Sequence, residues 1–226
     1  MTDGVELLRV VKPSDIEKKS FEIIDSEVPD PKPFSGIEWQ IVRRMIHTTA
    51  DFELVDLVRF HPEAVSAGLN ALRNGCSVVT DTEMARCGIP MRRMTPLNCS
   101  VACFMNDPDV IKRAQRESIT RAVAALDLAA ASNTPAIYVI GNAPTALIRL
   151  VERIKDDPHF SPSLVIGMPV GFVNAAESKK LLLMQSKIPY ISVEGRKGGS
   201  AMAACVVNAL AEVVLKERGL SGNISC

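Results

Sequence analysis

The residue best suited to catalysis is His47, which stands in the stretch Arg43-Arg44-Met45-Ile46-His47-Thr48-Thr49. Residues three and four positions before a helical residue share its face, so Arg43 and Arg44 flank His47 if a helix reaches that far. Histidine exchanges its proton near neutral pH and therefore suits acid–base catalysis. With two arginines beside it, His47 is arranged for an anionic ligand. The alternative is that it only caps the carboxyl end of a helix.

A second candidate site is the turn Gly141-Asn142-Ala143-Pro144. It follows an apolar run at 136–140 and precedes a helical pattern that reaches Ile154. This pattern indicates a strand, a tight turn and a helix with proline in its first turn. In an open α/β sheet such a turn lies at the carboxyl edge of the strands, where helix amides point at bound anions. The turn matches neither GxGxxG nor GxxxxGK(S/T), so an ordinary connection is the alternative.

The elements that must position these residues alternate along the chain. Five apolar runs predict strands, at 77–80, 99–104, 136–140, 163–166 and 190–193. Helices are expected at 62–74, around Met84, after Asn106-Asp107-Pro108, from Thr120-Arg121 to Ala131, at 144–154, at 176–184 and at 201–217. Five strand–turn–helix units predict a three-layer α/β/α fold with a mainly parallel sheet.

The first 60 residues read differently. Ser14-Asp15-Ile16-Glu17 and Ser35-x-x-Glu38 are capping boxes that each predict a helix start. Ser20 shares a helix face with Ile16 and Ile23, so it is either buried or faces a cleft. We expect residues 14–60 to be a helical region packed on the α/β core. Because no repeat or linker is visible, residues 1–226 are expected to form one domain.

The carboxyl edge of the predicted sheet should gather the polar turns. It collects Asp81, the Asn106 turn, Gly141-Asn142, the stretch 167–171 and the stretch 195–200. Three of these turns are rich in glycine, which brings backbone amides close to a ligand. Arg121, Arg196 and Lys197 add positive charge. This edge therefore predicts a large ligand with several carboxylates or phosphates, unless the glycines only close turns and the cations are only solvated.

Composition restricts the partners. The 226 residues carry 26 Lys and Arg against 26 Asp and Glu, a formal net charge of zero, which favours neither nucleic acid nor an acidic membrane surface. No signal peptide is visible, and the apolar runs are too short to cross a bilayer. The six cysteines show no zinc-binding spacing, so we expect reduced thiols in a cytoplasmic protein.

The chemistry is restricted as well. The chain contains no nucleotide fingerprint, no GxSxG nucleophile turn and no metal-ligand spacing, so we expect neither a cofactor nor a bound metal. One general acid in a shaped pocket for a polyanion suits an isomerisation or a lyase reaction.

Several segments together resemble the precorrin-8X methylmutase (precorrin isomerase) family of cobalamin biosynthesis. They are Arg44-Met45-Ile46-His47-Thr48-Thr49, Gly141-Asn142-Ala143-Pro144-Thr145-Ala146-Leu147, Pro169-Val170-Gly171-Phe172-Val173 with Glu177-Ser178-Lys179, and Gly195-Arg196-Lys197-Gly198-Gly199-Ser200. The resemblance runs in the family's order from about Ile16 to Leu210.

The resemblance implies a flavodoxin-like homodimer that moves a methyl group from ring carbon 11 to ring carbon 12 of a corrinoid polycarboxylate. The product is hydrogenobyrinate, or cobyrinate when cobalt is in the ring. By resemblance His47 is the general acid, and Ser20 and Arg121 contact the substrate. Other expected substrate contacts are Arg43, Arg44, Gly141, Asn142, Ala143, Gly171, Arg196, Lys197, Gly198 and Ser200. Hand-over to neighbouring pathway enzymes is a further expectation.

Two residues depart from the family pattern, because Ala50 stands where glycine is expected and Arg86 where an aliphatic residue is expected. Two other functions stay open at this point. One is a corrinoid carrier without catalysis, and the other is a phosphate-binding α/β transferase that uses Gly141-Asn142. The residues do not distinguish a cobalt-containing substrate from a metal-free one.

Overall fold

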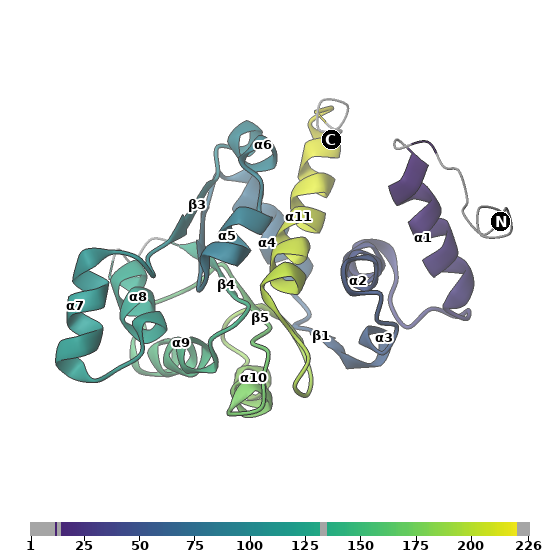
Figure 1. Ribbon diagram of the computed structural model, residues 1–226. Coiled ribbons are helices and arrows are strands. Elements are labelled where there is room, and N and C mark those ends of the chain that lie inside the picture. The colour runs from purple at the N-terminus through teal and green to yellow at the C-terminus, as the bar shows by residue number, and fades with distance from the viewer. Residues whose placement is uncertain (1–11, 13–14, 132–134, 221–226) are drawn as a thin grey trace, which may run out of the picture.

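The computed structural model describes residues 12, 15–131 and 135–220 (Figure 1). Within them one sheet has the strand order β1-β6-β5-β4-β2-β3. Its strands are β1 (Val58–Phe60), β2 (Ser77–Thr80), β3 (Ser100–Cys103), β4 (Ala136–Ile140), β5 (Leu164–Gly167) and β6 (Tyr190–Val193). Neighbouring strands are parallel except β1 and β6, which are antiparallel. The parallel strands, β3-β2-β4-β5-β6, have the flavodoxin-like order, so the predicted fold class is confirmed.

Helices cover both faces of this sheet (Figure 1). On one face lie α4 (Ala64–Arg73), α5 (Glu83–Gly88), α6 (Met91–Met94) and α11 (Ser200–Glu217), with α2 (Gly36–Thr49) packed on α11 and α1 (Ile16–Glu27) packed on α2. On the other face lie α8 (Arg121–Ala130), α9 (Pro144–Asp156) and α10 (Ala175–Met184), with α7 (Pro108–Glu117) packed on α8. The short helix α3 (Leu54–Leu57) and the 3-10 turn η2 (Thr95–Leu97) complete the described elements.

Strand β4 shows how the sequence builds two apolar layers. Side chains of a strand alternate between the two faces of its sheet. Ile137 and Val139 belong to the core under α11, whereas Ala136, Tyr138 and Ile140 belong to the core under α8 and α9. All five are buried, as an apolar run in a sheet covered on both faces should be.

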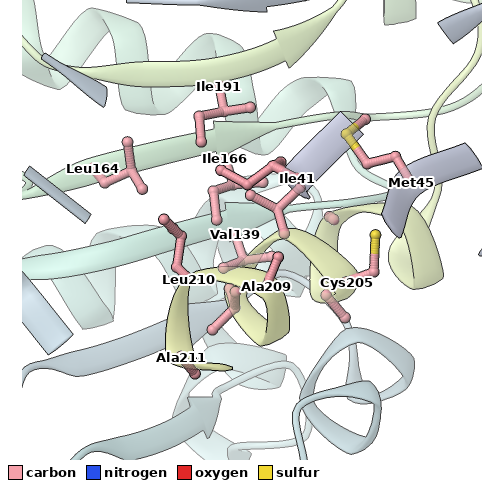
Figure 2. Packing of buried hydrophobic residues seen from close by; sticks show 14 of the residues in the cluster. Ile41, Met45, Val139, Leu164, Ile166, Ile191, Cys205, Ala209, Leu210 and Ala211 are labelled. Atoms are coloured by element: carbon pink, nitrogen blue, oxygen red, sulfur yellow. The ribbon is translucent and has the colours of Figure 1, made fainter. Parts of the chain in front are cut away.

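Small side chains on α11 let α2 pack closely against it. Figure 2 shows Cys205 and Ala209 of α11 near Ile41 and Met45 of α2. Ile41 and Met45 are fully buried, so α2 is fixed on the core along one face. The other face of α2, which carries His47, remains exposed.

The N-terminal region differs from expectation at its end, because residues 58–60 form the edge strand β1 and not a helix. Three residues are too few to show strand periodicity in a sequence. Helix α2 begins where predicted, but Ser35 makes no side-chain capping bond, so the predicted capping box is not formed there. For the first box, Ser14 lies outside the described residues, and Asp15 is the N-cap of α1.

Ala50 ends α2 in the left-handed conformation, with φ 53° and ψ 33°. This is the position where the family pattern predicts glycine. A residue with a Cβ atom is strained there, whereas glycine is not.

We therefore expect Ala50→Gly to raise the free energy of unfolding by about 1 kcal/mol. The matched control is Ala131→Gly, since Ala131 caps α8 with φ −64°, where alanine is unstrained. The free energy of unfolding of that variant should fall by ~0.5–1 kcal/mol, because glycine there adds conformational entropy to the unfolded chain and relieves no strain in the folded one. Urea titration measures both, and a shift of the two variants in the same direction would contradict the strain at Ala50.

Two expectations from the sequence concern membrane-spanning segments and the oxidation state of the cysteines. No helix among the described residues is long and apolar enough to pass through a bilayer. The five cysteines that the structure describes are free thiols, while Cys226 lies outside the described part.

Candidate functional site

His47 lies on the exposed face of α2, in the last turn of the helix. Its imidazole meets the ring of Phe21 from α1 edge-on, with ring centroids 5.3 Å apart and an interplanar angle of 66°. The same Phe21 ring lies under the guanidinium groups of Arg43, at 4.5 Å, and Arg44, at 5.4 Å. The helical spacing places both arginines beside His47, as their positions predict, and the ring of Phe21, which was not predicted, contacts all three side chains.

The two arginines are paired with carboxylates of the chain. Arg43 bonds Asp25, while Arg44 bonds Glu17 at 2.9 Å and also Glu212 of α11. Although burial opposes it, the hydrogen bond from Lys216 and the charge of Arg44 keep the pKa of Glu212 below its ordinary value. The arginines therefore tie α1 and α11 to α2 and are not free cations in this state.

A cleft of about 400 Å³ lies between α1, α2 and α11. Phe21, Arg43 and Arg44 line it, and His47 stands outside its wall. Ser20 is half-buried on α1, where its hydroxyl donates to the carbonyl of Ile16 at 2.9 Å. The face that Ser20 shares with Ile16 and Ile23 is not buried, since those side chains are 52% and 44% exposed.

At the carboxyl edge of the sheet, Asp81 is an anion supplied by the chain itself. It directly follows β2 and is buried. Its carboxylate accepts hydrogen bonds from the backbone N–H groups of Gly141 at 2.8 Å, Asn142 at 2.8 Å and Ala143 at 2.7 Å. Burial raises the pKa of Asp81, while these amide bonds oppose the rise. The amides expected to hold a substrate anion therefore already hold Asp81.

This arrangement argues against the phosphate-binding transferase. The crevice between β2 and β4 is the switch point where flavodoxin-like folds bind ligands. A phosphate on the amides of Gly141 to Ala143 would have to displace the Asp81 carboxylate or lie beside its charge.

Close backbone contacts join the neighbouring turns. A Cβ atom on Gly141 would lie 2.7 Å from the Cα atom of Ser200, at the start of α11. Ser200 is buried, and its hydroxyl lies 2.8 Å from the hydroxyl of Thr82, which follows Asp81. The turns after β2 and β4 and the start of α11 are thus in direct contact.

The turns after β5 and β6 are also packed on each other. A Cβ atom on Gly198 would lie 2.2 Å from the carbonyl oxygen of Met168, so this position accepts only glycine without movement. Gly199 N–H donates to the same Met168 carbonyl at 2.9 Å, and Gly171 N–H donates to the main-chain carbonyl of Arg196 at 3.2 Å. Gly171 adopts φ 137°, which also favours glycine.

Two cations lie in the turn that follows β6, residues 195–199, which we call the β6 turn, and they behave differently. Lys197 bonds Asp51 at 2.6 Å and Glu53 at 2.7 Å, just beyond the end of α2, and these bonds raise its pKa. Arg196 stacks over Phe172 at 5.4 Å and forms no ion pair with a described residue. Lys197 therefore links the turn to the helix of His47, and Arg196 remains open to a ligand.

Arg121 lies apart from His47. It is exposed at the first turn of α8, on the opposite face of the sheet from α2 (Figure 1). The hydroxyl of Thr120, next to it, lies 3.0 Å from that of Thr145, so the start of α8 lies beside the start of α9, which follows the Gly141–Ala143 turn. One chain therefore brings Arg121 to the carboxyl edge without bringing it to His47.

Lys179 of α10 has no exposed surface, although lysine is almost never buried without a partner. Its ammonium donates to the carbonyl of Lys197 at 2.5 Å, and it pairs with no carboxylate of the described residues. Burial lowers its pKa to about 8.

This lysine should give the protein a distinctive pH dependence. The unfolded chain binds a proton at Lys179 up to about pH 10.5, the folded chain only up to about pH 8, so stability rises with pH between them. We expect the free energy of unfolding of the wild type to gain about 3 kcal/mol over this window relative to Lys179→Met. Denaturant titrations from pH 7 to 10.5 measure it. Lys180→Met, at an exposed neighbour, should follow the wild type, and parallel curves for wild type and Lys179→Met would contradict the buried charge.

Sequence reasoning missed Phe21, Asp81 and Lys179 in these roles. Asp81 was placed at the edge, but nothing local to it shows that its partners are 60 residues away. Lys179 lies between buried positions of α10, and this apolar setting was its only signal. No group of three or more His, Cys, Asp or Glu side chains that could hold a metal ion occurs among the described residues.

Comparisons with known proteins agree with this fold. The family model described as precorrin-8X methylmutase matches residues 15–213. A cobalt-precorrin-8 methylmutase of Leptospira interrogans is 43% identical over 202 residues, covering 86% of this chain and 91% of that protein. A precorrin-8X methylmutase of Pseudomonas aeruginosa is 43% identical over 197 residues, covering 87% and 93%. A solved precorrin-8X methyl mutase structure from Thermus thermophilus has a TM-score of 0.83 and 42% identity, covering 90% of this chain and 97% of that one.

Proposed function

This chain belongs to the precorrin-8X methylmutase family, and we propose that His47 is the acid that drives its reaction. The protein is an isomerase of cobalamin biosynthesis, and its substrate is a corrinoid intermediate. In the proposed reaction the bond from ring carbon 11 to the methyl group breaks and a bond from carbon 12 to the same methyl group forms. Because the product is an isomer, the proton that His47 donates to the macrocycle is returned afterwards.

The observation that carries this proposal is the placement of His47. Its imidazole is exposed, is held by the edge of Phe21, and lies on the helix that Lys197 links to the carboxyl edge. An exposed imidazole held in one orientation can exchange its proton with a bound ligand and regain it from solvent.

We propose that the substrate lies across the carboxyl edge. Arg196 and Arg121 are exposed cations without a carboxylate partner among the described residues, and each suits a peripheral carboxylate of the macrocycle. Phe172 and Val173, 83% and 77% exposed, offer an apolar surface to the flat ring. Asn142 and Ser20 contribute polar side chains. Gly141, Ala143, Gly171, Gly198 and Ser200 shape the backbone around them.

We further propose a homodimer. Arg121 and His47 lie on opposite sides of the sheet in one chain, and in a homodimer the second copy would supply one of them to the same substrate. Analytical ultracentrifugation tests this step, and a monomer under assay conditions would remove Arg121 from the site.

The reaction itself is tested by absorption spectroscopy with purified protein. Cobalt-precorrin-8 and metal-free precorrin-8X are supplied in excess over the protein in separate assays. An isomerase converts the spectrum of the whole substrate pool, whereas a carrier changes only the amount that it binds. We expect conversion of at least one form, and a spectral change limited to one equivalent would favour the carrier.

The place of the reaction completes the proposal. We place it in the cytoplasm, because free thiols are retained in reducing compartments. Hand-over of the product to the next enzyme of the pathway would occur at the same open edge.

A further inference from the structure

Lys197 is held at two points that lie on opposite sides of the β6 turn. Its ammonium bonds Asp51 and Glu53, next to the end of α2. Its main-chain carbonyl accepts a hydrogen bond from the buried ammonium of Lys179 in α10. The turn is thereby joined to the helix of His47 on one side and to the opposite helical layer on the other.

A buried ammonium is a costly way to hold a carbonyl unless its position matters. An apolar side chain of similar length would fill the same space without the desolvation penalty. Only a donor, however, can fix the carbonyl of Lys197 in direction and distance, and a charged donor does so more strongly than a neutral one. Burial lowers the pKa of Lys179 to about 8, so at neutral pH the bond is charge-assisted.

The turn has little else to fix its position from the side of α10. Gly195, Gly198 and Gly199 give it a flexible backbone, and the first and last have positive φ angles of 75° and 130°. On the side of β5 the turn is held by backbone contacts alone, because Gly199 N–H donates to the Met168 carbonyl, Gly171 N–H donates to the Arg196 carbonyl, and Gly198 packs against Met168. If the bond from Lys179 is removed, no other side chain among the described residues donates a hydrogen bond to the backbone of Lys197.

We infer that Lys179 is a positioning residue for the methyl migration, and that its ammonium fixes the β6 turn so that Arg196 meets a carboxylate of the corrinoid. Lys179 does not touch the substrate, since its side chain has no exposed surface. The inference rests on the proposal that Arg196 binds substrate.

Steady-state kinetics with the full-length protein test the inference. Lys179→Met keeps the volume and removes the donor, so we expect KM to rise about tenfold while kcat changes less than about threefold. Lys179→Gln keeps a neutral donor and should restore part of the loss in KM. Lys180→Met, on the exposed side of the same helix, should match the wild type in both constants. Melting temperatures are recorded for every variant.

Two further variants separate the failure of this inference from the failure of the proposed site. Gly198→Ala moves the turn without touching Lys179, because its Cβ atom would lie 2.2 Å from a carbonyl oxygen, and it should raise KM in the same way. Arg196→Gln removes the proposed contact itself. If Arg196→Gln raises KM and Lys179→Met does not, Lys179 has no positioning role and the site stands. If neither raises KM, the site at the β6 turn is wrong, and the inference with it. If Lys179→Met melts well below the wild type and its kcat falls as much as its KM rises, the role is only structural.

Discussion

Asp81→Ala is expected to lower the free energy of unfolding by about 3–5 kcal/mol. The carboxylate accepts three backbone amides at 2.7–2.8 Å in a buried crevice, and alanine leaves all three donors without an acceptor. An unsatisfied buried donor costs roughly 1–3 kcal/mol, which sets the size of the effect. Asp81→Asn keeps one acceptor oxygen but turns an amide group toward other donors, so it should fall between alanine and the wild type.

Urea-induced unfolding followed by circular dichroism measures this loss. The control is Asn142→Ala, which removes an exposed side chain from the same turn and leaves its backbone bonds in place. That variant should change the free energy of unfolding by less than about 0.5 kcal/mol. Equal losses in the two variants would mean that the turn does not depend on the Asp81 carboxylate.

The fold could be predicted from the sequence because its signal is local. Runs such as Ala136 to Ile140 are apolar throughout, as strands covered on both faces must be, and each is followed by a helical period. The helices and strands that were predicted with bounds therefore begin and end within about two residues of expectation, whereas the short helices α3 and α6 were not predicted. Strand β1 was not predicted, because three residues are too few to show the alternation of a strand. Its pairing with β6 depends on residues 191–193, which lie far along the chain.

The candidate site could be predicted only in part, for a physical reason. The topology rule places turns on an edge, but it does not say which of their amides and charges are free. Asp81 occupies the amides after β4, and Glu17, Asp25 and Glu212 occupy the arginines beside His47. These partners lie far away in sequence and share no motif with the groups they neutralise. Neither could the sequence show that Arg121 and His47 lie on opposite faces of the sheet.

The largest expected effect on activity comes from His47→Ala. The proposal gives His47 one task, the donation of a proton to the bound macrocycle, and general acids typically contribute ~10²–10⁴-fold to a rate. The side chain is exposed and its ring contact is with Phe21 alone, so its loss should leave folding intact. The substrate contacts proposed for Arg196 and Arg121 are untouched, so corrinoid affinity should also persist. His159→Ala is the matched control, because His159 is exposed near the end of α9 and far from the carboxyl edge of β4.

The measurement that tests the central claim most directly is the single-turnover rate of His47→Ala, with the protein in excess over substrate and product affinity determined on the same preparation. We predict that the rate of spectral conversion falls by about 10²–10⁴ while the dissociation constant of the product stays within about threefold of the wild type, and that His159→Ala matches the wild type in both. A His47→Ala protein that converts its bound substrate at close to the wild-type rate would contradict the claim that this imidazole supplies the proton.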